Sequence, residues 1–264
     1  MYSPFKLATK FIKYYFTASS GKGHGVHSPF VYEFIEKVLN DKTEYECYSK
    51  IELQRQKLLQ NNEGIEVEDF GAGSTVIKTK IRVLKDIAAS SLKPKKFAQL
   101  LFRIVNYYGH KNIVELGTSL GITTSYLASV NSVVVTSLEG SKNIAAFAEQ
   151  NFVKIQRDNI RLIVGEFEKT LQPFLAQNKI IDLAFIDGNH RKVPTVQYFE
   201  QILPQTNENS FFVFDDIHWS KEMEEAWEII KNHKAVTLSI DLFFIGIVFF
   251  KKDFKVKQHF SIRF

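Results

Sequence analysis

Cysteine is almost absent from this sequence, which contains a single one, Cys47. One cysteine can form neither an internal disulfide nor a thiolate metal site, so we expect a reducing compartment, with the cytoplasm as the default. Long apolar runs are missing as well. The longest, Leu242 to Phe250, is too short to cross a bilayer, and residues 1–16 lack the apolar core and cleavage site of a signal peptide. The sequence therefore predicts no membrane span.

Glycine and proline are also scarce, with thirteen glycines and six prolines among 264 residues, while 45% of the residues are hydrophobic. Disordered and fibrous proteins are much richer in both, so a globular protein is expected. At roughly 150 residues per domain, the length fits one large domain or one domain with an appendage.

Acidic residues are missing from the start of the chain. Residues 1–27 contain four lysines and no acid, and residues 251–264 contain four lysines and one arginine against one aspartate. Because the net charge is only +5, the middle of the chain is slightly negative. A nucleic-acid groove through the main body is thus unsupported. Solvated basic ends are the simpler interpretation, and binding to an anionic surface is the alternative.

The pattern of the chain changes near residue 110. Before it, Ser28-Pro29 resembles a helix start, since serine often caps a helix and proline favours its first turn. Helical spacing continues through residues 45–60, 76–89 and 97–108. We place a boundary between residues 94 and 95: a helical region at 1–94, acting as a cap over the substrate or as an interaction surface, precedes a second domain at 95–264.

After Gly109 the chain alternates short β-rich runs with amphipathic stretches of helix length. The expected strands cover residues 112–117, 132–139, 160–165, 181–187 and 211–216. Such alternation is typical of an α/β fold, in which helices cover both faces of a parallel sheet. Residues 235–250 and 257–264 place further strands close together without a helix between them, which predicts an antiparallel finish to the sheet.

Two glycine-containing segments, EDFGAGS at 68–74 and VELGTSLG at 114–121, could each form a glycine loop. In a nucleotide-binding fold such a loop follows the first strand, so only one of them can take that place. The second loop leaves a strand, precedes a helix, and is followed by a strand ending in Glu139, 22 residues after Gly117. A carboxylate about 20 residues on suits a ribose diol. The first loop runs into a helical pattern with no such strand, so the second loop is the candidate.

The dinucleotide fingerprint G-x-G-x-x-G/A does not fit this loop, which has Ser119 and Ile122 where the fingerprint needs small or absent side chains. The cradle for a pyrophosphate is therefore missing. A ligand with a ribose but no phosphates fits better, and S-adenosylmethionine is such a ligand.

Several motifs resemble those of class I S-adenosylmethionine-dependent methyltransferases: residues 115–121, Glu139, and Gly165-Glu166 after a third strand. The segments FIDGNH (185–190) and FDDIHW (214–219) look like strand ends of the catechol-type and related small-molecule O-methyltransferases. The resemblance covers about residues 95–264. It implies a Rossmann-like, seven-stranded, mostly parallel sheet with an antiparallel C-terminal strand, preceded here by the helical N-terminal region.

The resemblance also implies a set of cofactor contacts. Gly117 and Gly121 would let the backbone approach the methionine part of S-adenosylmethionine, Glu139 would take the ribose hydroxyls, and Glu166 would lie near the adenine amino group. For Glu166 the alternative is a carboxylate that favours a helix start. The full implied set of cofactor residues is Glu115, Gly117, Thr118, Ser119, Gly121, Glu139, Glu166 and Asp187.

Acidic residues follow two neighbouring strands, with Asp187 after one and Asp215 and Asp216 after the other. Carboxylates gathered at one sheet edge repel each other unless a cation joins them, and oxygen ligands suit Mg²⁺, Ca²⁺ or Mn²⁺. We therefore predict a divalent metal site on these three residues. Metal-dependent O-methyltransferases commonly have asparagine where this chain has Asp216. The alternative makes Asp216 a helix cap and Asp187 a turn residue.

His190 lies three residues after Asp187, where the catechol enzymes have a lysine base, so His190 and Asp187 are the predicted catalytic residues. A histidine on a surface loop is the alternative for His190. The function this implies is O-methylation of a small-molecule hydroxyl. An RNA-modifying methyltransferase and a non-catalytic cofactor-binding or interaction module are the alternatives, and the oligomeric state, a homodimer included, stays open. We further predict that residues 27–30 and 69–74 cover the cleft and line the acceptor pocket.

Overall fold

The computed structural model describes residues 1–68, 79–177 and 180–264, and these form two compact units. Unit 1 comprises Met1–Asp41 and Lys179–Phe264, and unit 2 comprises Lys42–Asn178. The predicted loop at 69–74 lies outside the described residues. The predicted domain boundary between residues 94 and 95 stays a prediction. Among the described residues, no helix has the length and apolarity needed to cross a membrane.

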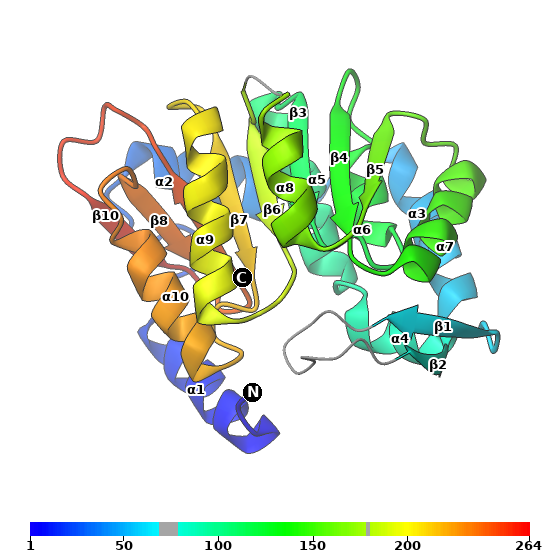
Figure 1. Ribbon diagram of the computed structural model, residues 1–264. Helices are drawn as coiled ribbons and strands as arrows, with labels where there is room; N and C mark the ends of the chain where they lie inside the picture. Colours follow the sequence, from blue (N-terminus) through cyan, green and yellow to red (C-terminus); the bar gives the residue numbers. More distant parts are fainter. Residues whose placement is uncertain (69–78, 178–179) are drawn as a thin grey trace. The chain divides into compact units, whose positions relative to one another are not determined.

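Unit 2 contains three parallel strands in the order β3-β4-β5 (Figure 1). Its elements are α3 (Glu46–Leu59), β1 (Gly64–Glu68), β2 (Thr79–Val83), α4 (Leu84–Ser91), α5 (Lys95–Tyr108), β3 (Asn112–Leu116), α6 (Ile122–Leu127), β4 (Val134–Glu139), α7 (Lys142–Ile155), β5 (Ile160–Val164) and α8 (Phe167–Leu175). In the register of these strands Leu116 pairs with Leu138, so β3 and β4 end side by side. The residues that follow both strands therefore meet at one edge.

Unit 1 contains five strands in the order β10-β8-β9-β7-β6. Its elements are α1 (Pro4–Thr17), α2 (Pro29–Phe34), the π-helical turn η1 (Ile35–Leu39), β6 (Leu183–Ile186), α9 (Lys192–Ile202), the 3₁₀ turn η2 (Leu203–Gln205), β7 (Phe211–Asp215), α10 (Lys221–Lys231), β8 (Leu238–Asp241), β9 (Ile245–Phe249) and β10 (Gln258–Ser261). β6 and β7 are parallel, with Ile186 beside Phe214, so they too end at one edge.

The five strands predicted between residues 112 and 216 are all present, and helices alternate with them, so the predicted Rossmann-like α/β fold is confirmed. The two units together contain eight strands of this sheet type, whereas the resemblance implied seven. The antiparallel finish is correct for β9, which runs against both β7 and β8. It is wrong for β10, which pairs parallel to β8. The connection from β9 to β10 crosses over β8, so the last strand regains the common direction.

The region before residue 95 is less uniformly helical than predicted. Helices at 45–60 and 97–108 are confirmed by α3 and α5, and Pro29 begins α2 as expected. The Ser28 side chain makes no capping hydrogen bond. The helix predicted over 76–89 is wrong for residues 79–83, because β2 pairs there with β1 in an antiparallel hairpin, and α4 starts only at Leu84; residues 76–78 lie outside the described residues. Alternating residues in TKIRV allow a strand, and pairing with β1 decides the outcome.

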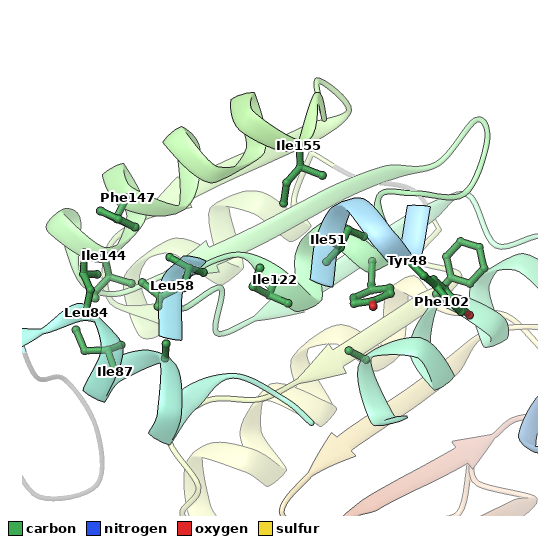
Figure 2. Packing of buried hydrophobic residues seen from close by; sticks show 14 residues of the cluster. Tyr48, Ile51, Leu58, Leu84, Ile87, Phe102, Ile122, Ile144, Phe147 and Ile155 are labelled. Carbon is green, nitrogen blue, oxygen red and sulfur yellow. The ribbon is translucent and has the colours of Figure 1, made fainter. Parts of the chain in front are cut away.

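The core of unit 2 joins helices from both sides of residue 94. Tyr48, Ile51 and Leu58 of α3 pack with Leu84 and Ile87 of α4, and Figure 2 shows these side chains directed toward one cluster. Members from later elements include Phe102, Ile122, Ile144, Phe147 and Ile155. Burial of each such side chain contributes roughly 1.5–3 kcal/mol of transfer free energy. α6, which follows the glycine loop, is thereby fixed against the rest of unit 2.

Candidate active site

The glycine loop leaves β3 through three residues with left-handed backbone. Gly117 has φ +105°, Ser119 φ +49° and Gly121 φ +78°. A side chain is poorly tolerated in this region, and a Cβ on Gly121 would also collide with the ring of Phe152. The Gly117 N–H donates to the carbonyl of Leu138 at 2.9 Å, which ties the loop to the end of β4. The predicted glycines therefore form a tight turn that exposes backbone.

Glu139 ends β4 and holds this loop through its side chain. Its Oε2 accepts a hydrogen bond from the Ser119 N–H at 2.9 Å, and its Oε1 accepts one from the Ser141 N–H at 3.0 Å. Burial raises the pKa of Glu139, and the backbone N–H donors partly oppose that shift. The backbone N–H groups of Gly140 and Thr118 also act on this carboxylate, so a diol would share its two oxygens with backbone donors. The loop and the acid that sequence reasoning paired are thus in contact.

Glu115 lies inside unit 2, with no exposed surface. Its Oε2 accepts hydrogen bonds from the hydroxyls of Ser137, at 2.6 Å, and Thr124. Ser137 also bonds to the hydroxyl of Thr118 in the loop. Burial raises the pKa of Glu115 to about 7. Through Ser137 the carboxyl group supports the loop from beneath, while its predicted contact with the cofactor stays a prediction.

Glu166 occupies the N-cap position of α8, but its side chain makes no capping hydrogen bond. Its Oε1 instead pairs with Nζ of Lys169 at 2.6 Å, and about a third of the Glu166 side chain is exposed. Glu166 therefore stands at a helix start, as the alternative interpretation expected, but its side chain does not cap the helix. Its predicted place near an adenine stays a prediction.

In unit 1, Asp187, His190 and Asp215 come together. Asp187 follows β6, Asp215 is the last residue of β7, and potential ligand atoms of the three side chains all lie within 4.8 Å of one another. Asp215 is 2% exposed. Two carboxylates this close, one of them buried, need a positive partner. A protonated His190 or a divalent cation bound by oxygen and imidazole ligands would serve, and such a mixed set suits Mn²⁺ or Mg²⁺.

The loop between β6 and α9 presents His190 through unusual backbone. Asn189 has φ +69° and His190 φ +31°. The Asn189 amide is held on both sides, since its Nδ2 donates to the hydroxyl of Tyr198 at 3.1 Å and its Oδ1 accepts from Nε of Arg191 at 2.8 Å. His190 Nε2 lies 3.6 Å from Oδ1 of Asp187. Strained backbone kept by side-chain bonds is a common feature of functional loops.

Asp216, the third predicted metal ligand, is not part of the group that Asp187, His190 and Asp215 form. Its backbone has φ +53°, its N–H donates to the carbonyl of Phe244 at 2.7 Å, and its carbonyl accepts from the N–H of Trp219. The alternative reading of Asp216 as a helix cap is wrong, because Ser220 caps α10 and accepts from the Met223 N–H. The left-handed turn after Asp215 separates the two neighbouring acids.

Trp219 and Asn189 are site residues that sequence reasoning did not select. The ring of Trp219 lies 5.6 Å from that of His190. The Trp219 carbonyl accepts a hydrogen bond from the Tyr2 N–H, so the beginning of the chain lies beside this loop. Both residues stand in the motifs FIDGNH and FDDIHW, which was the available signal. The contact with Tyr2 had none, because it joins positions far apart in the sequence.

Phe30, in the segment 27–30 that was predicted to cover the cleft, packs on the core of unit 1, and the cap as a whole stays a prediction. The ring of Phe30 packs against Phe249 of β9 at 5.2 Å. Phe249 pairs with Phe211 at the start of β7, whereas Asp215 pairs with Ile245 at its end. The four residue steps from Phe211 to Asp215 span about 13 Å, so Phe30 lies at the opposite end of β7 from the acidic group. The motif HSPF secures a helix start on the core instead.

Comparison with known proteins agrees with this fold. Residues 114–217, from β3 to just past Asp216, match the family model described as a methyltransferase domain. The fold is that of class I methyltransferases and resembles the small-molecule O-methyltransferases. No curated protein sequence matches the chain significantly.

Several solved methyltransferases share the fold at low sequence identity. An O-methyltransferase from Bacillus cereus, in complex with S-adenosylhomocysteine, has a TM-score of 0.56 and 18% identity, covering 83% of this chain and 97% of its own. The S-adenosylhomocysteine-bound methyltransferase PaMTH1 of Podospora anserina has a TM-score of 0.59 and 13% sequence identity. The match covers 96% of this chain and 98% of PaMTH1. TomG of Streptomyces achromogenes is an O-methyltransferase involved in tomaymycin synthesis, solved in complex with S-adenosylmethionine. It has a TM-score of 0.56 and 15% sequence identity, and the match covers 79% of this chain and 91% of TomG.

Proposed function

We propose that this protein is an S-adenosylmethionine-dependent O-methyltransferase acting on a hydroxyl of a small molecule. The observation that carries the proposal is the hydrogen bond from the loop N–H of Ser119 to the carboxylate of Glu139. It joins a left-handed glycine turn to an acid at the end of the next strand, and this pairing suits a ligand with a ribose diol and no pyrophosphate. The single cysteine fits the reducing cytoplasm as the place of action.

The chemistry requires an oxygen nucleophile. A hydroxyl attacks a sulfonium methyl group efficiently only once its proton is removed; the new C–O bond forms as the C–S bond breaks, and the electron pair of that bond stays on sulfur. We assign the proton to Nε2 of His190, because an imidazole ordinarily titrates near pH 6.5 and can accept a proton at neutrality. Asp187, 3.6 Å away, stabilises the imidazolium that results.

A divalent cation at Asp187, His190 and Asp215 would supply Lewis acidity and lower the pKa of an acceptor oxygen. Of these residues, Asp215 is the one that the base mechanism does not use, so it distinguishes the two devices. A histidine that binds a cation cannot at the same time accept a proton at the same nitrogen. Metal assistance and base catalysis by His190 are therefore separable by experiment.

The test is a product screen with S-adenosylmethionine labelled in its methyl group, run against a panel of phenols, catechols and aliphatic alcohols. We expect label in one acceptor class, a loss of about 10²–10⁴-fold in kcat for His190→Ala, and little change in cofactor affinity for that variant. His24→Ala, at an exposed position, is the matched control. Absence of S-adenosylmethionine binding by calorimetry would overturn the proposal, and label found only in RNA would replace the acceptor class.

A further inference from the structure

The helix α1 has an exposed apolar face. Phe5 and Phe16 are each 80% exposed and Ile12 is 55% exposed. These residues are spaced by seven and four positions, which places them along one side of the helix. The exposed Ala8 lies on the same side, between Phe5 and Ile12. We call Phe5, Ala8, Ile12 and Phe16 the outer face of α1.

The opposite side of α1 is already packed against unit 1. The rings of Phe11 and Tyr14 contact that of Phe243, with Phe11 edge to face at 5.1 Å, and Leu7 packs against the same cluster. Near its start, Lys10 Nζ lies 2.8 Å from Oε1 of Glu224 on α10. In Figure 1, α1 (blue) lies along the lower end of α10 (orange). Because these contacts fix the helix, its outer face remains exposed in the folded protein.

The charges that flank the outer face are all positive. Lys6 and Lys13 are exposed on α1, about a quarter of the helix circumference away from the line through Phe5, Ile12 and Phe16, and no acid occurs in residues 1–27. The first turn of the helix contains no acidic residue. An aromatic and aliphatic stripe beside lysines is the pattern of a helix that lies in the interface of an anionic bilayer.

We propose that the outer face of α1 docks on an anionic lipid surface. The 14-residue helix is about 21 Å long, so it lies in the plane of the headgroups and does not span the bilayer. Phe5, Ile12 and Phe16 would enter the acyl boundary, while Lys6 and Lys13 contact phosphate groups. The nearby Tyr15 ring, under the guanidinium of Arg263 at 5.3 Å, adds a further amphipathic side chain at headgroup level.

Two other occupants fit less well. A second copy of α1 packed by two-fold symmetry would bring Lys6 and Lys13 of both copies close together without an acid on either helix to pair with them. RNA would satisfy the lysines, and bases could stack on the rings of Phe5 and Phe16, but the aliphatic centre of the face, Ala8 and Ile12, offers no ring and would stay exposed to water. A lipid surface satisfies both the apolar stripe and the charge.

The experiment is co-sedimentation of the full chain with vesicles of phosphatidylcholine alone and of an equimolar mixture with phosphatidylglycerol. We expect binding to the mixed vesicles, much weaker binding to phosphatidylcholine alone, and loss of binding near 1 M salt, where the Debye length is about 3 Å. Phe5→Ser/Phe16→Ser should weaken binding at least about tenfold. Lys6→Glu/Lys13→Glu should weaken it at least about 25-fold, since each lysine near an anionic surface contributes about fivefold.

The control variants make the same kinds of substitution at exposed positions outside α1. Val153→Ser removes an apolar side chain that is 76% exposed on α7, and Lys95→Glu/Lys142→Glu changes the net charge equally at exposed positions. Both should bind as the wild type does. All substitutions are at exposed sites, and circular dichroism verifies folding.

Three results would overturn the proposal. The first is no sedimentation of the wild type with mixed vesicles, or sedimentation that the α1 variants do not change. The second is a dimer in vesicle-free solution that Phe5→Ser/Phe16→Ser converts to a monomer, which would assign the face to a second copy. The third is salt-sensitive RNA binding lost in the same variants. None of these readouts depends on methyl transfer, so the proposal stands or falls separately from the proposed function.

Discussion

Glu139 holds the glycine loop and is also our candidate ligand for the ribose, so one substitution affects both roles. Two substitutions of different severity are needed to separate them. It accepts backbone hydrogen bonds from Ser119 and Ser141, and it is the residue we assign to the ribose diol. A residue that shapes the loop and also contacts the ligand affects affinity by both routes. Replacement by glutamine keeps one acceptor oxygen for the Ser119 N–H, whereas alanine removes both acceptors.

Glu139→Ala should weaken S-adenosylhomocysteine binding by about 1.5–3 kcal/mol, the range for a hydrogen bond to a charged group, and Glu139→Gln should fall between alanine and wild type. Isothermal titration calorimetry measures both. Glu149→Gln, at an exposed position on α7, is the control and should bind normally. Wild-type affinity in Glu139→Ala would show that the ribose lies elsewhere.

Glu115 is a fully buried acid that binds two hydroxyl donors through one oxygen, while Oε1 accepts no hydrogen bond from the described residues. Burial raises its pKa to about 7, from an ordinary value near 4.5. The folded state therefore holds this proton more tightly than the unfolded chain does. Its contribution to the free energy of unfolding is complete below about pH 4.5 and is lost as the pH rises through 7.

In the Glu115→Gln variant this pH dependence should disappear, because glutamine is neutral at every pH. Relative to the variant, the wild type should lose about 3 kcal/mol of unfolding free energy between pH 4.5 and 7.5. Urea unfolding at a series of pH values gives the difference. If the difference between the two proteins were independent of pH, Glu115 would be ionised throughout, and the burial argument would fail.

At the scale of elements, α1 is attached to unit 1 by a small charged network. His218 bonds through Nδ1 to Oε1 of Glu224, at 3.1 Å, and through Nε2 to Oδ2 of Asp241, at 2.8 Å. Glu224 in turn accepts from the hydroxyl of Tyr2 and from Lys10. His218 also stacks on Phe243, which packs against α1. The network joins α1, α10 and β8.

Protonated His218 should strengthen this network. Burial by itself lowers the pKa of His218, but hydrogen bonds and charge from Asp241 and Glu224 outweigh burial and raise it. A raised pKa means that the stabilisation is complete below about pH 6.5, the unfolded value, and is lost as the pH rises through the folded value. In urea unfolding, wild type should therefore lose stability relative to His218→Gln as the pH rises above 6.5.

His24→Gln serves as the control for this prediction, since His24 is exposed and should leave the pH dependence unchanged. Hydrogen exchange of α1 amides gives a local readout, and in the wild type it should speed up above pH 6.5 more than exchange in α5 does. Equal pH profiles for wild type and His218→Gln would show that the histidine titrates alike in both states.

At the scale of the whole molecule, the two candidate clusters belong to different units. The glycine loop and Glu139 belong to unit 2, whereas Asp187, His190 and Asp215 belong to unit 1. A ligand that binds only the folded form stabilises it by about 2.7 kcal/mol at a concentration 100 times its dissociation constant. Melting temperature in the presence of each ligand therefore reports on each cluster separately.

With saturating Mn²⁺ or Mg²⁺, the melting temperature should rise by about 5–10 °C, and Asp215→Asn should abolish that rise while leaving the rise with S-adenosylhomocysteine intact. Asp253→Asn, at an exposed position in the same unit, is the control. Chelator should return the wild type to its cation-free melting temperature. A melting temperature insensitive to cations, together with full activity in chelator, would leave base catalysis by His190 as the only device of this cluster.

The sequence by itself determined what depends on neighbours along the chain. Periodicity located the five parallel strands, and the spacing from Gly117 to Glu139 identified the loop and acid that are now seen to be hydrogen-bonded. The placement of Asp187 and Asp215 after adjacent strands followed from the rule that parallel strands end at one edge. These features are local, because strand ends and tight turns are set by a few consecutive residues.

Tertiary structure decided what depends on partners far away in the chain. Pairing with β1 made a strand of residues 79–83, and pairing with β8 set the direction of β10. The loop after β6 brought His190 beside Asp187 and Asp215, whereas Asp216, although it adjoins Asp215 in sequence, lies outside that group. Packing of one side of α1 on Phe243 left its other side exposed. Side-chain direction and strand pairing are fixed by long-range contacts, which the local pattern of residues does not contain.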